Sequence, residues 1–305
     1  MPVDLKAVTR RPPEVVKVRV KRFHPEKGQG WWQTYEIKTY RGMTVLDALL
    51  KIKAEVDHTL VFRYSCRMGV CGSCGVVVNG EPRLSCQTQI SEKATPERPE
   101  VVVEPLYNFP VLRDLTTDFT EFFEKHRKVR PYLIRLDKQE RENPALEYEQ
   151  RPEELEAFYE YTLCISCGLC DAACPVYASN PRFLGPQALA YAYRYLADSR
   201  DEGWRLRLEE LERDGSVYRC HFAASCSSVC PKVVDPAGAI QRLRRALLAY
   251  NLRLFKKRTA KNVEPMKVSA ERWPLPPEAR LMEGVDLEAQ EKGAPVIPKE
   301  KLLED

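Results

Sequence analysis

The chain has 305 residues, of which 44% are hydrophobic and 30% charged, so it is long enough for two domains with apolar cores. Its 48 basic and 44 acidic residues give a net charge of +4, a balance too even to indicate nucleic acid as a partner. The apolar runs are far shorter than the roughly 18 residues of a membrane span, and the N-terminus lacks the apolar core of a secretory signal. We therefore expect a globular chain that is neither membrane-spanning nor exported.

Residues 15–108 begin with the pattern of a β-hairpin. Valine alternates with charged residues over 15–23, as in a half-buried strand. Residues 24–32 predict the turn into a second strand at 33–40.

A helix and a second hairpin follow in the same segment. Thr44 and Asp47 predict a capping pair for the helix that begins directly after Thr44. Asn79 and Gly80 are a turn signal between two short strands. Two strands, a helix and a cysteine-containing loop in this order predict a β-grasp ferredoxin domain.

The periodicity becomes helical after about residue 111, over 114–129, 185–203 and 236–255. The last part of the chain is rich in proline and charge and has no sustained period, which is typical of extended or partly disordered segments. The predicted fold class is therefore α+β. The predicted parts are an N-terminal extension, a plant-type ferredoxin domain, a helical ferredoxin domain and a tail, at residues 1–14, 15–108, 109–252 and 253–305.

The eleven cysteines indicate metal sites better than disulfides. Their number is odd, which does not fit a complete disulfide framework, and residues 87–163 contain none. In a reducing compartment thiolates stay free to bind iron or zinc. The cysteines form three groups, at Cys66, Cys71, Cys74 and Cys86, at Cys164, Cys167, Cys170 and Cys174, and at Cys220, Cys226 and Cys230.

The first group has the spacing C-x4-C-x2-C followed by a fourth cysteine, which is the plant-type [2Fe-2S] pattern. Gly69, Gly72 and Gly75 allow the backbone to pass close to a cluster and to donate N–H groups to its sulfur atoms. We therefore predict a [2Fe-2S] site on Cys66, Cys71, Cys74 and Cys86. A zinc site with four thiolates is the alternative.

The second group has the bacterial ferredoxin spacing C-x2-C-x2-C-x3-C-P, in which the fourth cysteine binds the other of two clusters. By this crossing rule, we expect a bacterial-ferredoxin-like helical domain with a [4Fe-4S] cluster on Cys164, Cys167, Cys170 and Cys230. The remaining site has the three ligands Cys174, Cys220 and Cys226.

Ala223 stands where the same rule requires a further cysteine in the third group. Three thiolates suit a [3Fe-4S] cluster, in which one corner iron is absent. The alternative is a [4Fe-4S] cluster whose fourth iron binds water or another side chain.

The chain has no recognisable catalytic motif of its own. It contains no G-x-G-x-x-G, P-loop or G-x-S-x-G sequence, so flavin or substrate chemistry is expected on another subunit. Of its four histidines, only His221, which follows a cluster ligand, is placed to act near a site. These features predict an electron-transfer subunit.

The segments "SCRMGVCGSC", "RDLTTDF", "CISCGLCDAACPVY", "LGPQALAYAYRYLADSRDEG" and "CSSVCPKVVDPAGAI" closely resemble the iron-sulfur subunit of succinate dehydrogenase and quinol:fumarate reductase. The resemblance covers residues 16–250. It implies a FAD-containing flavoprotein partner, membrane anchor subunits, a quinone and, on the anchors, haem b. It also implies the order [2Fe-2S], [4Fe-4S], [3Fe-4S] from flavin to quinone, and a peripheral position at the cytoplasmic face of the inner membrane.

The quinone side differs from the pattern of many members that reduce ubiquinone. These carry tryptophans shortly after the proline that follows the fourth cysteine, whereas this chain has Ala178 and Ser179 there. The resemblance therefore favours menaquinone, and its quinone-side candidates are Pro175, Ser179, His221 and Ala223.

Two other classes of protein are alternatives, and one further type is set aside within the redox class. The small subunit of molybdenum hydroxylases shares the first cysteine pattern, but its second cluster requires a C-x-C sequence, which is missing here. A soluble fumarate or heterodisulfide reductase would carry paired CCG motifs, and none is present. A zinc-stapled binding protein is the alternative without redox activity.

Overall fold

The computed structural model describes residues 11–138, 142, 147–213, 216–257, 260 and 262–263. Most of the predicted N-terminal extension and nearly all of the predicted tail lie outside these residues. Among the described residues, no helix has both the length and the apolar character needed to cross a bilayer.

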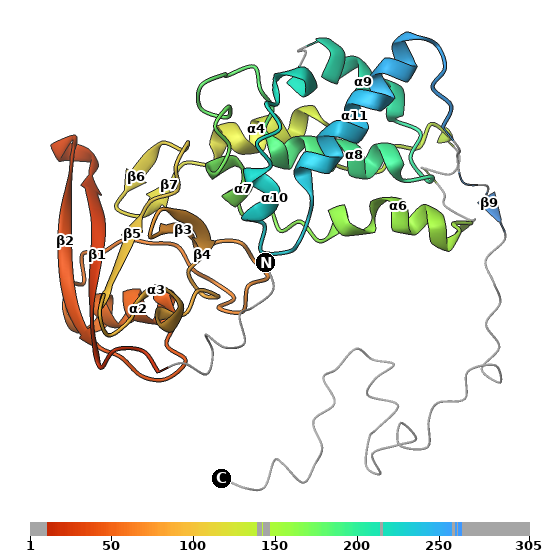
Figure 1. Ribbon diagram of the computed structural model, residues 1–305. Helices are drawn as coiled ribbons and strands as arrows, with labels where there is room; N and C mark the ends of the chain where they lie inside the picture. The colour runs from red at the N-terminus through yellow and green to blue at the C-terminus, as the bar shows by residue number, and fades with distance from the viewer. Residues whose placement is uncertain are drawn as a thin grey trace, which may run out of the picture. The chain divides into compact units, whose positions relative to one another are not determined.

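A five-stranded sheet forms the N-terminal domain (Figure 1). Its strands stand in the order β2-β1-β5-β3-β4, and β1 and β5 are the parallel pair. The strands are β1 (Val15–His24), β2 (Gln29–Lys38), β3 (Gly75–Val78), β4 (Glu81–Leu84) and β5 (Glu100–Glu104). Helices α2 (Val45–Glu55) and α3 (Ile90–Lys93) belong to the same domain, and α2 packs its apolar side against the sheet.

The hairpin and the capped helix are confirmed, with one correction to the turn. Pro25–Lys27 form a short 3-10 helix, η1, and Gly28 ends it with a φ of +61°. The second strand therefore begins at Gln29, so Trp31 and Trp32 lie in β2 and not in the turn. The predicted turn is too long, because tryptophan and glycine interrupt the alternation of apolar residues at the start of the strand.

Two local predictions hold in detail. Thr44 and Asp47 form a capping box at the start of α2, in which each side chain accepts a hydrogen bond from the backbone N–H of the other residue. Asn79 and Gly80 have φ angles of +48° and +83°, as a tight hairpin turn between β3 and β4 requires.

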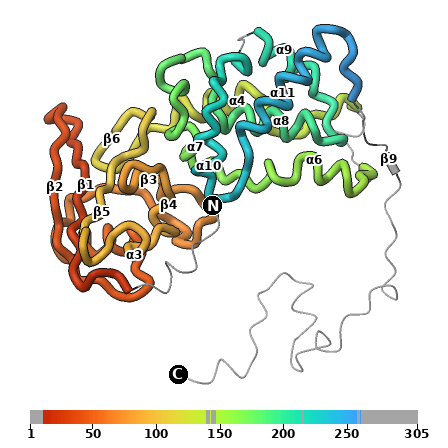
Figure 2. The backbone as a smooth tube through the Cα atoms, viewed as in Figure 1, coloured from red at the N-terminus to blue at the C-terminus, as the bar shows by residue number. Residues whose placement is uncertain are grey.

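The segment after the sheet is less helical than its periodicity predicts. It forms a small hairpin of β6 (Val111–Arg113) and β7 (Thr116–Thr117) before helix α4 (Thr120–Lys128) begins. Asp114 turns the chain with a φ of +47°, and its carboxylate accepts a hydrogen bond from Arg22 of β1. This tertiary contact outweighs the helical pattern at 114–119. In the backbone trace of Figure 2, β6 and β7 lie between the sheet and the helices.

The remaining elements are mostly helical. α8 (Pro186–Ala197) packs against α6 (Pro152–Thr162) and α11 (Pro236–Asn251). α8 ends at Ala197 because Asp198 adopts an extended conformation, so the predicted helix at 185–203 is shorter than expected. The elements are β8 (Glu147–Tyr148), α6 (Pro152–Thr162), α7 (Leu169–Ala172), α8 (Pro186–Ala197), α9 (Trp204–Arg213), η2 (Ser216–Arg219), α10 (Ser225–Ser228), α11 (Pro236–Asn251) and β9 (Asn262–Val263).

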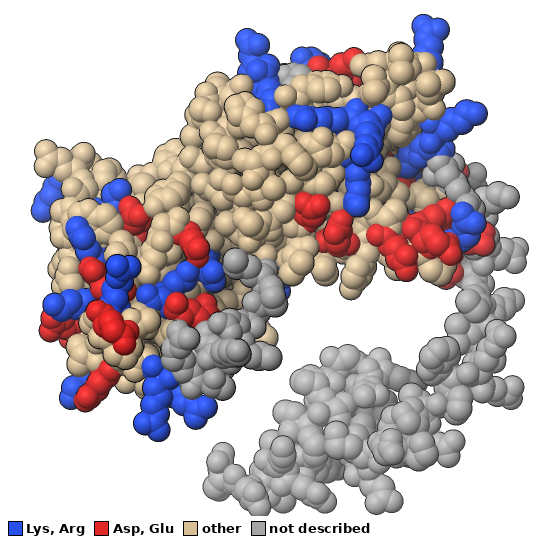
Figure 3. Space-filling view, viewed as in Figure 1, with Lys and Arg blue, Asp and Glu red and all other residues tan. Residues whose placement is uncertain are grey.

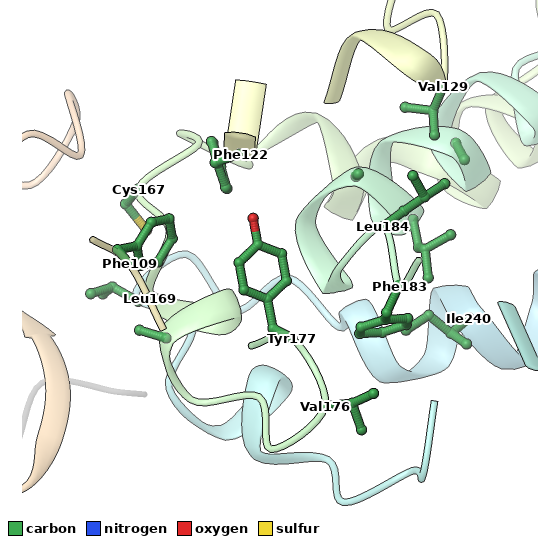
Figure 4. Packing of buried hydrophobic residues seen from close by; sticks show 14 of the residues in the cluster. Phe109, Phe122, Val129, Cys167, Leu169, Val176, Tyr177, Phe183, Leu184 and Ile240 are labelled. Carbon is green, nitrogen blue, oxygen red and sulfur yellow. The ribbon is translucent and has the colours of Figure 1, made fainter. Parts of the chain in front are cut away.

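One apolar core joins the sheet domain to the helices. It contains Cys74 and Cys86 of the first cysteine group together with Cys167 of the second. Figure 4 shows Cys167 beside Phe109 and Leu169, at one end of this core. The first and second cysteine groups therefore share a continuous packed interior.

The first residues of the predicted tail pack on the helical domain. The ring of Phe255 lies 5.1 Å from that of Trp204, measured between centroids. The Lys257 ammonium donates a hydrogen bond to the carbonyl of Tyr195 over 3.2 Å. Contacts of this kind extend at least to Ala260, whose N–H donates to the carbonyl of Ser199.

Candidate metal centres

In the loop before β3, several backbone N–H groups surround the Sγ atom of the first cysteine, Cys66. The backbone N–H groups of Met68, Val70 and Cys71 donate to Cys66 Sγ over 3.3–3.4 Å. These hydrogen bonds lower the pKa of the Cys66 thiol to about 6. A loop of this kind stabilises a thiolate, which is the form that binds metal.

Cys86 follows β4 and closes the same site. It is hydrogen-bonded to Cys74, which lowers the pKa of Cys74 to about 6 and raises that of Cys86. Cys86 also accepts a hydrogen bond from the N–H of Gly69 and interacts electrostatically with Cys66. Thiols of the first group thus converge from a loop and a strand end, as expected from the spacing.

Four thiols line a second pocket, which has about 390 Å³ of empty space. They are those of Cys164, Cys167, Cys170 and Cys230. Burial raises the pKa of Cys164 to about 11 and that of Cys167 to about 12, and it also raises the pKa of Cys170 well above its usual value. Thiolates are costly in such a buried place unless a cation offsets their charge, so the chemistry of the donor set fits a buried metal cluster. No group of three or more histidine, cysteine or acidic side chains among the described residues is arranged to hold a single metal ion.

A third pocket, of about 340 Å³, has three thiols. Cys174, Cys220 and Cys226 line it, and among the described residues no further cysteine does. Burial raises the pKa of Cys226 to about 12 and also raises that of Cys174. The N–H of Phe222 donates to Cys220 Sγ over 3.3 Å, and Ala223 is part of the wall.

The cysteine inside helix α7 and the cysteine just after it line different pockets. Cys170, inside the helix, lines the second pocket, and Cys174, just beyond its end, lines the third. The side-chain amide of Asn108 lies within 2.9–3.1 Å of the carbonyls of Asp171, Ala172 and Cys174. Asn108 thereby caps the C-terminal end of α7 from the segment that follows the sheet domain.

The quinone-side candidates divide into two sets. Pro175, His221 and Ala223 line the third pocket together with apolar residues such as Phe222. Ser179 is not among the lining residues, and its hydroxyl donates to the carbonyls of Pro175 and Val176.

Sequence reasoning missed polar groups beside the second pocket. Gln187 lines that pocket, and its side-chain nitrogen lies 3.0 Å from His126 Nδ1 and 3.2 Å from Ser166 Oγ. His126 is half-buried against Tyr191, and burial lowers its pKa. Asp171, next to Cys170, is almost completely buried, which raises its pKa to about 7. The position of His126 could not be predicted from its neighbours in the sequence. A histidine four residues after an aromatic residue in a helix gives no indication that it lies beside a cysteine pocket.

Two family models match the chain in the order of its domains. A model of the 2Fe-2S iron-sulfur cluster binding domain matches residues 17–124, and one of the 4Fe-4S dicluster domain matches residues 160–234. The fumarate reductase iron-sulfur subunit of Mycobacterium tuberculosis is 44% identical over 239 residues, which are 78% of this chain and 95% of the relative. The chain belongs to the family of iron-sulfur subunits of fumarate reductase and succinate dehydrogenase.

Other relatives of this family agree. The succinate dehydrogenase iron-sulfur subunit of Paracoccus denitrificans is 40% identical over 240 residues, covering 77% of this chain and 88% of the relative. A solved structure, the Mycobacterium smegmatis Sdh1 complex in the apo form, contains a chain that is 28% identical and superimposes with a TM-score of 0.68. That match covers 79% of this chain and 98% of the other.

Several predictions are thereby confirmed. The fold class, with a [2Fe-2S] ferredoxin domain followed by a helical [4Fe-4S] domain, is as expected. The chain is an electron-transfer subunit of a multi-subunit oxidoreductase. Since the first cysteine group lies inside the 2Fe-2S match, the zinc alternative loses its basis. The domain boundaries and the individual ligands stay predictions.

Proposed function

We propose that this subunit carries electrons between the FAD of a flavoprotein partner and a membrane quinone through [2Fe-2S], [4Fe-4S] and [3Fe-4S] clusters. When bound, these clusters supply one-electron carriers. The proposed ligands are Cys66, Cys71, Cys74 and Cys86 for [2Fe-2S], Cys164, Cys167, Cys170 and Cys230 for [4Fe-4S], and Cys174, Cys220 and Cys226 for [3Fe-4S].

The pocket with three thiols carries the proposal. Its wall holds Cys174, Cys220 and Cys226 and includes Ala223, which stands where the ferredoxin spacing requires a further cysteine. A cluster with one iron fewer fits this donor set. Because core charge is one of the factors that set cluster potentials, this end of the chain is expected to have a higher potential than its neighbour.

Exposed apolar side chains near the first thiol site and near the third pocket support the docking of partner subunits at both places. Met68 and Val70 are 69% and 50% exposed in the first cysteine loop, and Phe222 is 54% exposed beside the third pocket. On the face in Figure 3, charged side chains are sparse over α7, α10 and the β6–β7 hairpin. Apolar surface without charge is typical of protein interfaces. We assign the surface near the first thiol site to the flavoprotein and the surface near the third pocket to anchor subunits.

The quinone is proposed to lie at the third pocket. Pro175, His221 and Ala223 are the candidate contacts, and Ser179 contributes by fixing the turn after Pro175. The residues at 178 and 179 favour menaquinone. The subunit would then sit peripherally at the cytoplasmic face of the membrane, held by anchor subunits that also carry haem b.

Ala223→Cys tests the assignment of the third cluster. The substitution restores the ferredoxin spacing, so we expect a [4Fe-4S] cluster in place of [3Fe-4S]. Low-temperature electron paramagnetic resonance should show the signal of oxidised [3Fe-4S] in the wild type and lose it in the variant. The added thiolate should also lower the potential, and about 60 mV would be a tenfold change in a one-electron equilibrium.

Ala223→Val is the matched control, since it adds bulk without a thiol. It should keep the [3Fe-4S] signal. The assignment is wrong if the oxidised wild type shows no such signal, or if Ala223→Cys keeps the wild-type signal and potential.

A further inference from the structure

The loops of the first two thiol sites touch at one glycine. A Cβ atom at Gly72 would lie 2.9 Å from the carbonyl oxygen of Ile165, and 3.0 and 3.1 Å from Cβ and Cα of Cys167. Ordinary van der Waals contact begins at 3.4 Å, so any side chain here would push the two loops about 0.5 Å apart. The clashing atoms belong to the backbone or to a cysteine held in the core, and neither can rotate away.

This contact connects the two proposed ligand sets directly. Gly72 lies between Cys71 and Cys74 in the first loop, and it faces Cys167 in the second. The backbone of the first ligand set is therefore in direct van der Waals contact with Cys167, a proposed ligand of the second set.

The loops diverge beside this contact. A pocket with about 710 Å³ of empty space opens next to it and is lined from one side by Cys71, Gly72 and Ser73 and from the other by Ile165 and Ser166. Beside this pocket, the close approach at Gly72 adds to the shared apolar core that contains Cys74 and Cys167. Gly75 approaches the second loop less closely: a Cβ there would lie 3.3 Å from the side chains of Leu106 and Leu169, and 3.4 Å, an ordinary contact distance, from the carbonyl of Cys167.

We propose that Gly72 is a positioning residue that sets the separation of the first and second clusters and thereby the rate of electron transfer between them. One electron passes at this step, so one site is oxidised as the other is reduced, and no atom or proton moves. The proposal rests on the cluster assignment under the proposed function.

Gly72 also has a φ of +76°, so Gly72→Ala would strain the backbone of its own loop. Gly80 separates the two effects. Its φ is +83°, and a Cβ there would meet no described atom within 4 Å. Gly80→Ala therefore carries a comparable backbone strain without the close approach.

The experiment compares wild type, Gly72→Ala and Gly80→Ala in the purified complex with its partner subunits. Iron content and optical spectra first establish that the clusters are loaded. The microwave-power saturation of the reduced [2Fe-2S] signal then reports magnetic relaxation by the neighbouring reduced cluster, which weakens with distance. We expect Gly72→Ala to lose part of this relaxation enhancement and to transfer electrons between the two clusters more slowly, and Gly80→Ala to match the wild type in both.

The outcomes separate this proposal from the one it rests on. If the wild type lacks a [2Fe-2S] or a [4Fe-4S] signal, the cluster assignment itself fails. If both signals are present and Gly72→Ala keeps wild-type relaxation and transfer rate, the assignment stands and the role of Gly72 is wrong. Equal losses in Gly72→Ala and Gly80→Ala would also overturn it, since strain alone would then account for the effect.

A second variant covers the case in which Gly72→Ala does not assemble. Gly75→Val approaches the same cysteine loop from a backbone without a left-handed φ, and its methyl groups extend beyond a Cβ that would already lie 3.3–3.4 Å from Leu106, Leu169 and the Cys167 carbonyl. A loss of relaxation enhancement in the loaded Gly75→Val complex supports the proposal, and an unchanged signal contradicts it.

Discussion

Replacing Arg22 with methionine should destabilise the sheet domain by about 3 kcal/mol and release its cluster at lower denaturant. Arg22 is 3% exposed, and its guanidinium donates to Asp114 over 2.8 Å, to Asp57 over 2.6 Å and to the hydroxyls of Tyr35 and Thr59 over 2.7 and 3.0 Å. These contacts connect β1 and β2 to the segment between α2 and the first cysteine loop, through Asp57 and Thr59, and to the β6–β7 turn, through Asp114. Methionine keeps most of the buried length but none of the donors.

The magnitude follows from the partners that remain. Removing one member of a buried ion pair typically costs about 3–5 kcal/mol, because the other charge is left without compensation. Asp114 would still accept hydrogen bonds from the N–H groups of Phe23 and Val61 over 3.1 and 2.9 Å. Asp57 would keep Thr59, which donates from both its N–H and its hydroxyl. The residual bonds place the cost at the lower end of the range.

The assay is urea unfolding of the loaded chain, followed by circular dichroism and by loss of visible absorbance. With a slope of about 1–3 kcal/mol per molar urea, the midpoint should fall by about 1–3 M. Arg83→Met is the control, since Arg83 pairs with Glu81 over 3.0 Å but its side chain is 25% exposed, and such pairs contribute less than about 1 kcal/mol. Equal midpoints for the two variants would show that the buried Arg22 contacts contribute no more than an exposed ion pair.

Three further predictions concern the end of the helical domain and the enzyme. Burial lowers the pKa of Lys257 to about 8 from 10.5, so between these values the unfolded chain binds a proton that the folded chain does not, and wild-type stability rises with pH. Lys257→Met lacks this titration, so its free energy of unfolding relative to the wild type should fall by up to about 3 kcal/mol as the pH rises from 8 to 10.5. A pH-independent difference in urea midpoints would contradict this. Truncation after residue 252 should leave all cluster iron in place, because every cysteine lies at or before Cys230, yet lower the thermal midpoint through loss of the Phe255 and Lys257 contacts. Loss of iron from the truncated chain would show that the deleted part closes a site. Succinate added anaerobically to the reconstituted chain alone should leave its oxidised spectrum unchanged, and rapid bleaching would show that no flavoprotein is needed.

The features that could be predicted from the sequence are local. The capping box at Thr44, the turn at Asn79 and the ferredoxin spacings each involve residues a few positions apart, and each has a direct chemical reason. The crossing of Cys174 to the third pocket follows from a spacing rule that already includes the geometry of two clusters.

The features that could not be predicted depend on distant contacts. Helix α4 starts at Thr120 because Asp114 turns the chain toward Arg22, which is 92 residues earlier. Gly72 is restricted by Ile165 and Cys167 of another loop, and no pattern around Gly72 contains that information. The half-buried position of His126 likewise depends on Gln187 of α8.

The amide of Asn108 limits how freely the two ferredoxin units can be recombined. It belongs to the segment that follows the sheet domain, but its hydrogen bonds go to the end of α7, between the second and third thiol pockets. A gene fusion that joined a different [2Fe-2S] module at residue 109 would leave three carbonyls of that helix end without their donor. Shuffling these units as independent cassettes would therefore require the incoming module to end in an asparagine at the same place.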